Sequence, residues 1–271
     1  GEIMVELHPS AMAVAPNRRY VVVANTGSDT LSVIDTRTDT VVEKIWTRSN
    51  PGDLFGAQPN ALTFHPGGRR IYVCNGTQNA VAVIQFEPED NASKAVGFIP
   101  VGWFPGAVEF DAQRSTLCVA NIKGLGAIKD FKPDERVKLT TRDFFGAVSL
   151  VPVPGERELG SMSEAVLRNM RYPMIQEARL APRPNQRPRP IPERAGEPSL
   201  FKHVIYVIKE NRTYDQVLGD FATGNGGSNL RTFGWGCQPK QPQLGRAFVP
   251  PDKPYTDGEQ MPEGQQRGAR P

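Results

Sequence analysis

The stretch Tyr20-Val21-Val22-Val23-Ala24-Asn25 decides the fold, because it is the first of three similar strands that each end in asparagine. The second is Arg70-Ile71-Tyr72-Val73-Cys74-Asn75, and the third is Thr116-Leu117-Cys118-Val119-Ala120-Asn121. The three asparagines are 50 and 46 positions apart. A repeat of about 40 to 50 residues is the length of a unit of four short strands, so the period excludes short solenoids.

Further short strands lie on both sides of each copy, separated by turn residues. Their alternating apolar side chains and their β-branched residues are typical of half-buried strands. We expect first strands with their turns at residues 13–17, 62–68 and 108–112, third strands at 30–35 and 80–84, and a fourth strand at 41–45. The sequence therefore predicts a mainly β fold with about three antiparallel blades, a partial β-propeller, since closed propellers have 4 to 8 blades.

The repeats resemble those of YVTN/YncE-type β-propellers, and residues 20–25 and 35–41 carry the resemblance. It implies that residues 1–155 form a partial YncE-like propeller. The chain opens without an initiator methionine and partway through a repeat. We therefore expect a fragment, whose missing blades belong to the same protein and would cover the exposed blade edges.

The composition argues against several classes of partner. Lys and Arg (32) nearly balance Asp and Glu (29), so the net charge of +3 gives no reason to expect nucleic acid or an anionic membrane. No stretch approaches the roughly 20 apolar residues of a membrane span, and the first residues do not have the pattern of a signal peptide. Glycine (26) and proline (25) are abundant, which favours turns and a linker over long helices.

The chain has three cysteines, Cys74, Cys118 and Cys237. An odd number without paired metal-ligand spacing indicates neither a disulfide framework nor a zinc site. Cys74 and Cys118 lie within predicted strands, which favours buried core residues over a redox role. His65 lies in a Pro-Gly-Gly turn, where capping the turn or a surface position is favoured over a role as a ligand.

Residues 156–199 are expected to form a helix followed by a linker. Residues 146–153, just before them, read as one more strand, the last of the partial propeller. Ser161 and Glu164 have the spacing of a capping box, and an apolar stripe follows before Pro173, so we expect a single helix that packs on a neighbouring domain. Six prolines between residues 182 and 198 favour an extended, polyproline-like linker. An SH3 ligand is the less favoured alternative.

The residues that could take part in a reaction follow the linker, in residues 200–271. Residues 201–208 form an apolar run that predicts a buried strand, and residues 209–219 continue it toward the start of a helix. Glu210 and Asn211 would then lie at the end of this strand, where a carboxylate and a carboxamide oxygen suit a divalent cation. The helix start would favour a phosphate. The structural alternative is that Asn211 or Thr213 only caps the helix and that Glu210 interacts with its dipole.

This stretch resembles the opening motif of the phosphoesterase family that includes bacterial phospholipases C and acid phosphatases, within the alkaline-phosphatase-like fold. The resemblance implies that Glu210 and Asn211 are metal ligands, while Arg212, Thr213 and Asp215 belong to the motif without an assigned role. From the first blade to about Gly234 the chain resembles bifunctional YncE/alkaline-phosphatase proteins. That implies a truncated α/β phosphoesterase domain, a divalent metal cofactor, a phosphate-ester substrate, and export to the periplasm or outside the cell.

The resemblance breaks down near the end of the chain. Family members place a serine or threonine nucleophile just after a strand that corresponds to residues 255–259, and Met261 occupies that position here. A thioether cannot attack phosphorus. No histidine follows His203, so the downstream Asp and His ligands of such a site are missing. We expect no catalytic residue in this chain and no activity of the isolated polypeptide without the downstream phosphatase domain.

Two other hypotheses stay open. The first is a non-catalytic propeller that serves as a binding or interaction module, with the C-terminal segment as a packing arm. The second is a reading frame that is corrupted after about Gly234, which would leave a disordered tail.

Overall fold

The computed structural model of the chain describes residues 1–53, 56–123, 145–205 and 217–218. These residues fall into two units, one with residues 1–123 and 145–179 and one with residues 180–205 and 217–218. The first unit contains the predicted blades. Among the described helices, none is long and apolar enough to cross a bilayer.

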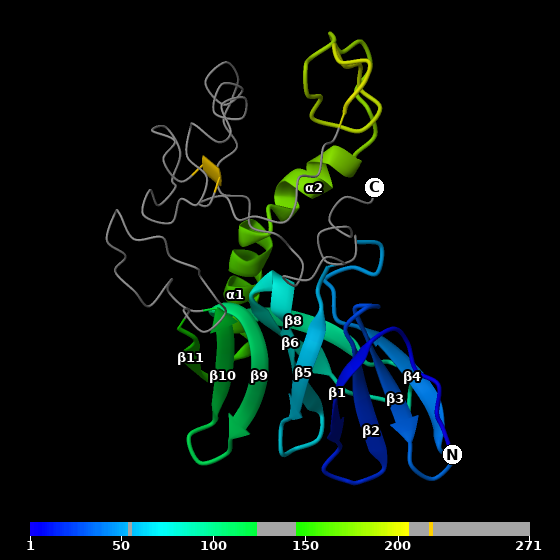
Figure 1. Cartoon of the computed structure of the whole chain (residues 1–271), viewed down its shortest axis with the longest axis vertical. Helices are drawn as coiled ribbons and strands as arrows, with labels where there is room; N and C mark the ends of the chain where they lie inside the picture. Colours follow the sequence, from blue (N-terminus) through cyan, green and yellow to red (C-terminus); the bar gives the residue numbers. More distant parts are fainter. Residues whose placement is uncertain (54–55, 124–144, 206–216, 219–271) are drawn as a thin grey trace. The chain divides into compact units, whose positions relative to one another are not determined.

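Three antiparallel sheets form the first unit, as the sequence predicts (Figure 1). The first is β1-β2-β3-β4, the second is β5-β6-β7-β8, and the third has the order β11-β10-β9. Their strands are β1 (Pro9–Val14), β2 (Tyr20–Asn25), β3 (Thr30–Asp35), β4 (Thr40–Trp46), β5 (Pro59–Phe64), β6 (Arg70–Asn75), β7 (Ala80–Gln85), β8 (Lys94–Pro100), β9 (Trp103–Asp111), β10 (Thr116–Lys123) and β11 (Ala147–Pro152). Each sheet is one blade, and β11 confirms the strand expected near residues 146–153.

The first strand of every blade begins in the same way. A left-handed residue, a proline, a bulged residue and an alanine follow one another in each case. The three copies are His8-Pro9-Ser10-Ala11, Gln58-Pro59-Asn60-Ala61 and Phe104-Pro105-Gly106-Ala107, with φ of 52°, 51° and 55° at the leading residue. A bulge bends the strand and increases its twist. In the third copy the bulged residue is Gly106, where a Cβ would lie 2.5 Å from Cδ1 of Ile122, so that a larger residue would require the exposed Ile122 side chain to move.

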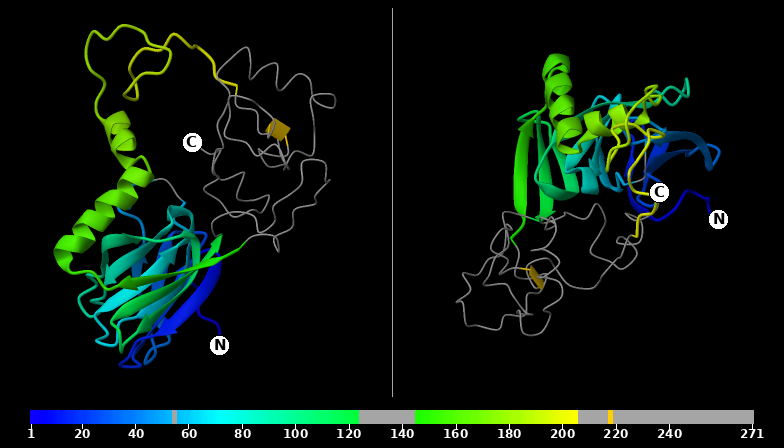
Figure 2. Two further views of the ribbon diagram at one scale, coloured as in Figure 1. Left: turned by 90° about the vertical axis from the view of Figure 1, so that its left-hand side faces the viewer. Right: turned by 90° about the horizontal axis from the view of Figure 1, so that it is seen from above.

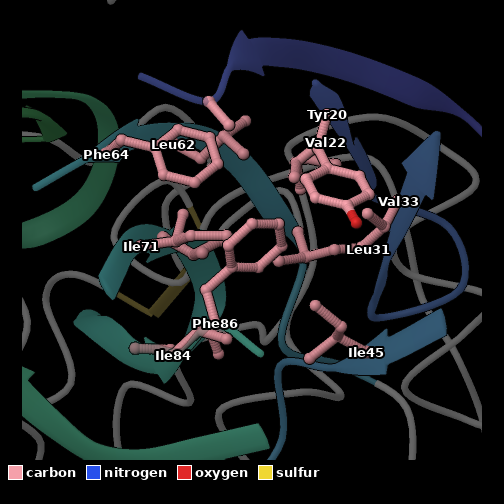
Figure 3. Packing of buried hydrophobic residues seen from close by; sticks show 14 of the residues in the cluster. Tyr20, Val22, Leu31, Val33, Ile45, Leu62, Phe64, Ile71, Ile84 and Phe86 are labelled. Carbon is pink, nitrogen blue, oxygen red and sulfur yellow. The ribbon is translucent and has the colours of Figure 1, made fainter. Parts of the chain in front are cut away.

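Two hydrophobic cores hold neighbouring blades together. The first lies between blades one and two, and Figure 3 shows its side chains reaching toward one another from the two sheets. Phe86 packs edge-on against Tyr20 and Phe64, with ring centroids 5.8 Å and 5.3 Å apart. The second core lies between blades two and three and includes Tyr72, Cys74 and Leu117. Side chains alternate between the two faces of each strand. In blade two, one face therefore packs on blade one and the other face on blade three.

Helix α1 (Glu156–Asn169) covers the outer ends of both cores. It lies beside β8 in both views of the molecule (Figures 1 and 2). Val166 belongs to the first core and Leu159 to the second. The backbone N–H of Phe98 donates to Oγ of Ser163 at 2.8 Å, so the helix also satisfies a donor of β8. The apolar stripe of this helix thus packs on the blades themselves.

The capping box expected at Ser161 and the single helix expected before Pro173 were both wrong, although the region begins at Glu156 as expected. α1 begins five residues before Ser161, at Glu156. The Ser161 hydroxyl donates to the Arg157 carbonyl within the helix instead of capping it. A second helix, α2 (Tyr172–Arg179), follows the left-handed Arg171. Proline is tolerated in a first helical turn, so Pro173 opens α2 rather than ending the region.

Helix α2 is anchored to the loop between β4 and β5. The Tyr172 hydroxyl donates to Oδ1 of Asp53 at 3.2 Å, and Nη1 of Arg179 donates to the same oxygen at 2.8 Å. The burial of Tyr172, together with nearby Asp53, raises the pKa of its phenol. The two helices therefore connect the third blade back to the loop that joins the first two blades.

The proline-rich segment of the second unit is folded back on itself, which differs from the extended linker expected. Arg183 bonds Glu197 at 2.7 Å and Glu193 at 2.7 Å. The Leu200 N–H donates to the Arg189 carbonyl at 2.9 Å, within a short parallel bridge. Charged pairs separated by about ten residues override the polyproline preference of the composition and close a loop.

Residues 201–205, the first half of the predicted buried strand, form no strand. They are exposed, with Val204 at 84% and Ile205 at 88%. An apolar run becomes a buried strand only where neighbouring strands accept its backbone bonds and cover its faces. The rest of that run and nearly all of the expected α/β domain at residues 200–271 lie outside the described residues.

Replacing Gly97 on β8 should test the contact with α1. A Cβ there would lie 2.6 Å from Cγ of Leu159, so Gly97→Ala should lower the free energy of unfolding by about 1–3 kcal/mol through overpacking. Gly160→Ala is the matched control, since a Cβ at Gly160 meets nothing within 4 Å and should stabilise α1 by about 0.5–1 kcal/mol. Urea unfolding measures both. Equal midpoints for the two variants would contradict the packing described.

Acid should open the loop held by Arg183. The hydrogen bond from Arg183 lowers the pKa of Glu197 from its ordinary value of 4.5 to about 2. Because the folded pKa is the lower one, the stabilisation is fully present above pH 4.5 and is lost as the pH falls through about 2. An NMR titration of the Glu197 carboxyl should show this value, and Arg183→Gln should return it toward 4.5. A midpoint near 4.5 in the unmodified protein would rule out the ion pair in solution.

Candidate functional site

The predicted metal ligands, Glu210 and Asn211, lie outside the described residues, and so does Met261. Their roles therefore stay predictions. Within the part of the chain that the structure describes, no three His, Cys, Asp or Glu side chains gather as a metal-ligand group. Cys237 also lies outside that part.

His65 caps a turn, as expected. Its Nδ1 accepts the backbone N–H of Gly67 at 3.0 Å, and its carbonyl accepts the N–H of Gly68 at 2.9 Å. Gly68 has φ of 72°, a conformation that glycine adopts without strain. The imidazole packs 4.9 Å from the ring of Phe110. The sequence interpretation of His65 is confirmed.

Cys74 is a core residue in the second hydrophobic core and is a free thiol. Burial raises its pKa to about 12. The thiolate is the reactive form of cysteine, so Cys74 is chemically inert near neutral pH. Cys118, also free, is partly exposed on β10.

The candidate binding site is a polar cleft of about 480 Å³ between the first two blades. Three loops line it: the β1–β2 turn, the β5–β6 turn and the start of the β7–β8 connection. We call it the loop cleft and define it by residues 15–17, Tyr20, residues 67–69 and residues 86–90. Turn residues at the tips, such as Pro16, Gly67 and Gly68, keep the strands short there and leave the cleft open.

A charged network lies beside the loop cleft and reaches it through Tyr20 and Glu89, which line it. Nε and Nη2 of Arg19 both lie 3.2 Å from Oδ2 of Asp35, and Nη1 of Arg19 lies 3.7 Å from Glu89. The Tyr20 hydroxyl donates to Glu89 at 3.2 Å. Arg19 and Asp35, which do not line the cleft, therefore help to hold the two side chains that do.

Two of these groups hold a fixed protonation state near neutral pH. The backbone N–H of Arg37, and then the Arg19 guanidinium, lower the pKa of Asp35. Burial, and then the charge of Glu89, raise the pKa of Tyr20. Asp35 thus stays ionised and Tyr20 stays a neutral donor. In the cleft itself, the Tyr20 hydroxyl therefore suits the binding of a polar molecule better than proton transfer.

At the opposite ends of the strands, one side chain of blade one holds the start of blade two, and one side chain of blade two holds the start of blade three. We call this contact the blade clamp. Asp29 has φ of 56°, and its carboxylate accepts three backbone N–H groups, from Gly56 (2.8 Å), Ala57 (3.0 Å) and Gln58 (2.9 Å). Asn79 has φ of 51°, and its Oδ1 accepts the N–H of Phe104 at 2.9 Å. Gln58 and Phe104 are the left-handed residues that open blades two and three.

The backbone repeats the same pattern. Thr47 donates its N–H to the Asp29 carbonyl, and Val101 donates to the Asn79 carbonyl, at 3.0 Å in both cases. In the first clamp the buried guanidinium of Arg48 also lies 3.9 Å from the Asp29 carboxylate. Sequence reasoning missed both clamp residues. A signal was present, because an Asp or Asn stands four positions after Asn25 and Asn75.

The three repeat asparagines at this edge are structural. Asn25, Asn75 and Asn121 are buried. Their amide groups donate to Ser32 at 2.9 Å, to the Thr47 carbonyl at 2.8 Å and to Ser149 at 2.9 Å. They therefore tie the end of the second strand of each blade to an adjacent strand or connection, which explains why asparagine recurs there.

Comparison with known proteins points to the propeller fold. The model of the family described as Lactonase, 7-bladed beta-propeller matches residues 4–110, which span blades one and two and most of β9. No curated protein gives a significant match. The blade architecture and this family match agree on a β-propeller.

Several solved structures resemble part of the chain. Hydrazine synthase of Kuenenia stuttgartiensis is 21% identical, with a TM-score of 0.36, over 45% of this chain and 31% of that one. A putative 6-phosphogluconolactonase of Bacteroides uniformis is 16% identical, with a TM-score of 0.38, over 44% and 34%. A Lactobacillus plantarum protein is 24% identical, with a TM-score of 0.37, over 42% and 34%. The chain thus spans about a third of the structures it matches.

Removing the first blade clamp should destabilise the whole unit. Asp29→Ala should lower the free energy of unfolding by about 3 kcal/mol or more, because it removes the acceptor of three buried N–H groups and a carboxylate beside buried Arg48. Asp39→Ala is the matched control: Asp39 is exposed and has φ of 53°, so only the left-handed conformation is penalised, by about 1 kcal/mol. Chemical denaturation of both variants measures the difference. Equal losses would refute the clamp.

Proposed function

We propose that the chain is part of a metal-dependent hydrolase of phosphate esters, in which the propeller blades serve recognition and the residues after position 200 serve chemistry. One observation carries the proposal: three blades are followed in the same chain by the stretch from Lys209 to Gly219, with Glu210-Asn211-Arg212-Thr213-Tyr214-Asp215 at its centre. The order of the parts, blades first and motif second, resembles the bifunctional family, and so does the motif itself. Export to the periplasm or the exterior belongs to the same proposal.

The donor set of the motif fits a hard or borderline divalent cation. Glu210 would supply a carboxylate oxygen and Asn211 a carboxamide oxygen, which are the ligands that such cations take in proteins. A bound cation would neutralise charge on the phosphoryl oxygens. Two ligands are fewer than a catalytic site needs, so the remaining ligands and the nucleophile would come from a longer protein. We therefore propose that the 271-residue chain alone is inactive.

The loop cleft supports a recognition role for the blades. The neutral hydroxyl of Tyr20 and the side chain of Glu89 line the cleft as hydrogen-bonding groups, and Arg19 and Asp35 belong to the network beside them. The Tyr20 hydroxyl can orient a polar molecule without exchanging a proton with it. In this proposal the loops of the blades bind, and the reaction is left to the metal ligands.

A non-catalytic binding propeller is the second candidate. The observation that bears on it is that the family match covers residues 4–110, within the blades, and does not extend to the stretch around Glu210. The name of that family also suggests a lactone as an alternative substrate of a hydrolytic propeller. The candidates differ in whether Glu210 is needed for activity.

Replacing Glu210 should separate the candidates. In the longer protein that carries this chain, Glu210→Gln should lower the rate of p-nitrophenyl phosphate hydrolysis in added Mn²⁺ or Zn²⁺ by about 100-fold or more, since even partners of metal ligands typically cost 10–100-fold. Glu193→Gln, outside the motif, should leave the rate unchanged. Isothermal titration of the 271-residue chain with the same metals gives a second readout, in which Glu210→Gln weakens binding.

The opposite results are equally informative. An unchanged rate in Glu210→Gln would show that the motif has no part in the reaction. Hydrolysis of a δ-lactone without hydrolysis of the phosphate ester would assign the activity to the propeller. The absence of both activities in the longer protein would leave the binding module as the function.

A further inference from the structure

The two helices that follow the blades are attached to them in different ways. Helix α1 inserts Leu159 and Val166 into the two hydrophobic cores, where they are 7% and 2% exposed. None of the eight residues of α2 is buried. Its apolar side chains are exposed, with Met174 at 66% and Ile175 at 37%. Burial of apolar area therefore fixes α1 but contributes little to the position of α2.

Polar contacts with one loop hold α2 instead. The Tyr172 hydroxyl and Nη1 of Arg179 both donate to Oδ1 of Asp53, and Nη2 of Arg179 donates to the Gly52 carbonyl at 3.3 Å. Tyr172 and Arg179 are the first and last residues of α2. Their separation of seven residues, about two turns, places them on the same face of the helix. One carboxylate oxygen therefore receives donors from both ends of α2.

The loop that carries Asp53 is itself held by a buried side chain. Arg48, which is 4% exposed, donates through Nη2 to the Pro51 carbonyl at 3.0 Å and through Nη1 to the Asp53 carbonyl. The same guanidinium lies 3.9 Å from the Asp29 carboxylate of the blade clamp. Because these contacts do not involve α2, the loop does not need α2 to hold its place.

A short joint separates α1 from α2. Only Met170 and Arg171 lie between the two helices, and Arg171 has φ of 55°. In Figure 1, α1 lies along the sheets and α2 continues beyond it. Residues at the ends of elements can absorb the change of dihedral angles in a hinge motion. A rotation at this joint would move α2 without disturbing the two cores.

We propose that α2 is a strap with two positions, docked on the loop through Asp53 or released from it. The docked contact is polar and partly open to water, since the side chains of Arg179 and Asp53 are 38% and 15% exposed. Partly exposed ion pairs contribute little free energy and weaken with salt. A helix of eight residues is also marginally stable on its own. Release therefore exposes the backbone of α2 to solvent.

The strap sets the point at which the chain leaves the blades, because α2 ends at Arg179. The docked strap fixes that point. The released strap extends the reach of the following residues by the length of α2, about 12 Å as a helix. If Glu210 and Asn211 bind the metal, the strap controls how far that part of the chain can range from the blades. This role rests on the proposed function, whereas the strap itself does not.

Hydrogen exchange of the 271-residue chain, followed by mass spectrometry, tests the strap. At low salt the amides of α2 should be protected. Asp53→Ala should make them exchange about 3- to 10-fold faster, because both donors lose their acceptor. Tyr172→Phe and Arg179→Gln should each produce part of that effect. These two variants alter only the helix side of the contact, so they test the strap even if Asp53→Ala disturbs the loop.

Two controls separate release of α2 from general unfolding. The amides of α1 should keep their protection in every variant. Arg157→Gln, at an exposed position of α1 outside this contact, should leave exchange in α2 unchanged. Raising NaCl from about 0.05 M to about 1 M should speed exchange in α2 and not in α1, because salt screens the partly exposed ion pair.

Three results would each overturn the strap. They are unprotected α2 amides in the unmodified chain at low salt, equal protection with and without the Asp53 carboxylate, and loss of protection in α1 together with α2. None of these readouts depends on hydrolysis. The strap and the phosphate-ester proposal can therefore fail separately.

Discussion

The arrangement of the described blades rests on the blade clamp, in which a left-handed Asp or Asn captures the start of the second blade and of the third. Asp29 binds three consecutive N–H groups and Asn79 binds one. Both residues pay a small conformational cost that short polar side chains tolerate. The clamp fixes where the left-handed residue and proline of the next blade stand, and through them the bulge and the first strand. The other contacts between neighbouring blades depend on this placement.

Hydrophobic packing between the blades then adds stability, but it does not select which blade follows which. Each blade has two apolar faces, and the two cores form because the clamp brings the back of one sheet onto the front of the next. Helix α1 covers the outer ends of both cores with Leu159 and Val166, and α2 returns to the loop at Asp53. The same logic explains why the ends of the array carry exposed apolar side chains. A repeat builds the same faces whether or not a neighbour follows.

The scaffold and the proposed chemistry have opposite requirements. Buried or paired groups such as Cys74, His65 and Asp35 are held in one protonation state or one orientation, which stabilises the blades and shapes the loop cleft. Phosphate-ester hydrolysis needs metal ligands that remain accessible to substrate. The proposed division, with recognition on the blades and Glu210 and Asn211 after the linker, places each requirement in a separate part of the chain.

The blades could be predicted from local signals, because alternating side chains, turn residues and a repeat near 50 positions are enough to indicate β-structure. The same reading identified His65 as a turn cap and Cys74 as a core residue, while Glu210 and Asn211 remain predictions that lie outside the described residues. The sequence did not indicate what α1 packs on, that residues 183–200 close into a loop, that residues 201–205 are exposed, or which side chains clamp the blades. Those outcomes depend on contacts between residues distant in sequence, such as Ser163 with Phe98 and Arg183 with Glu197, and no local pattern encodes which distant partner a residue will meet.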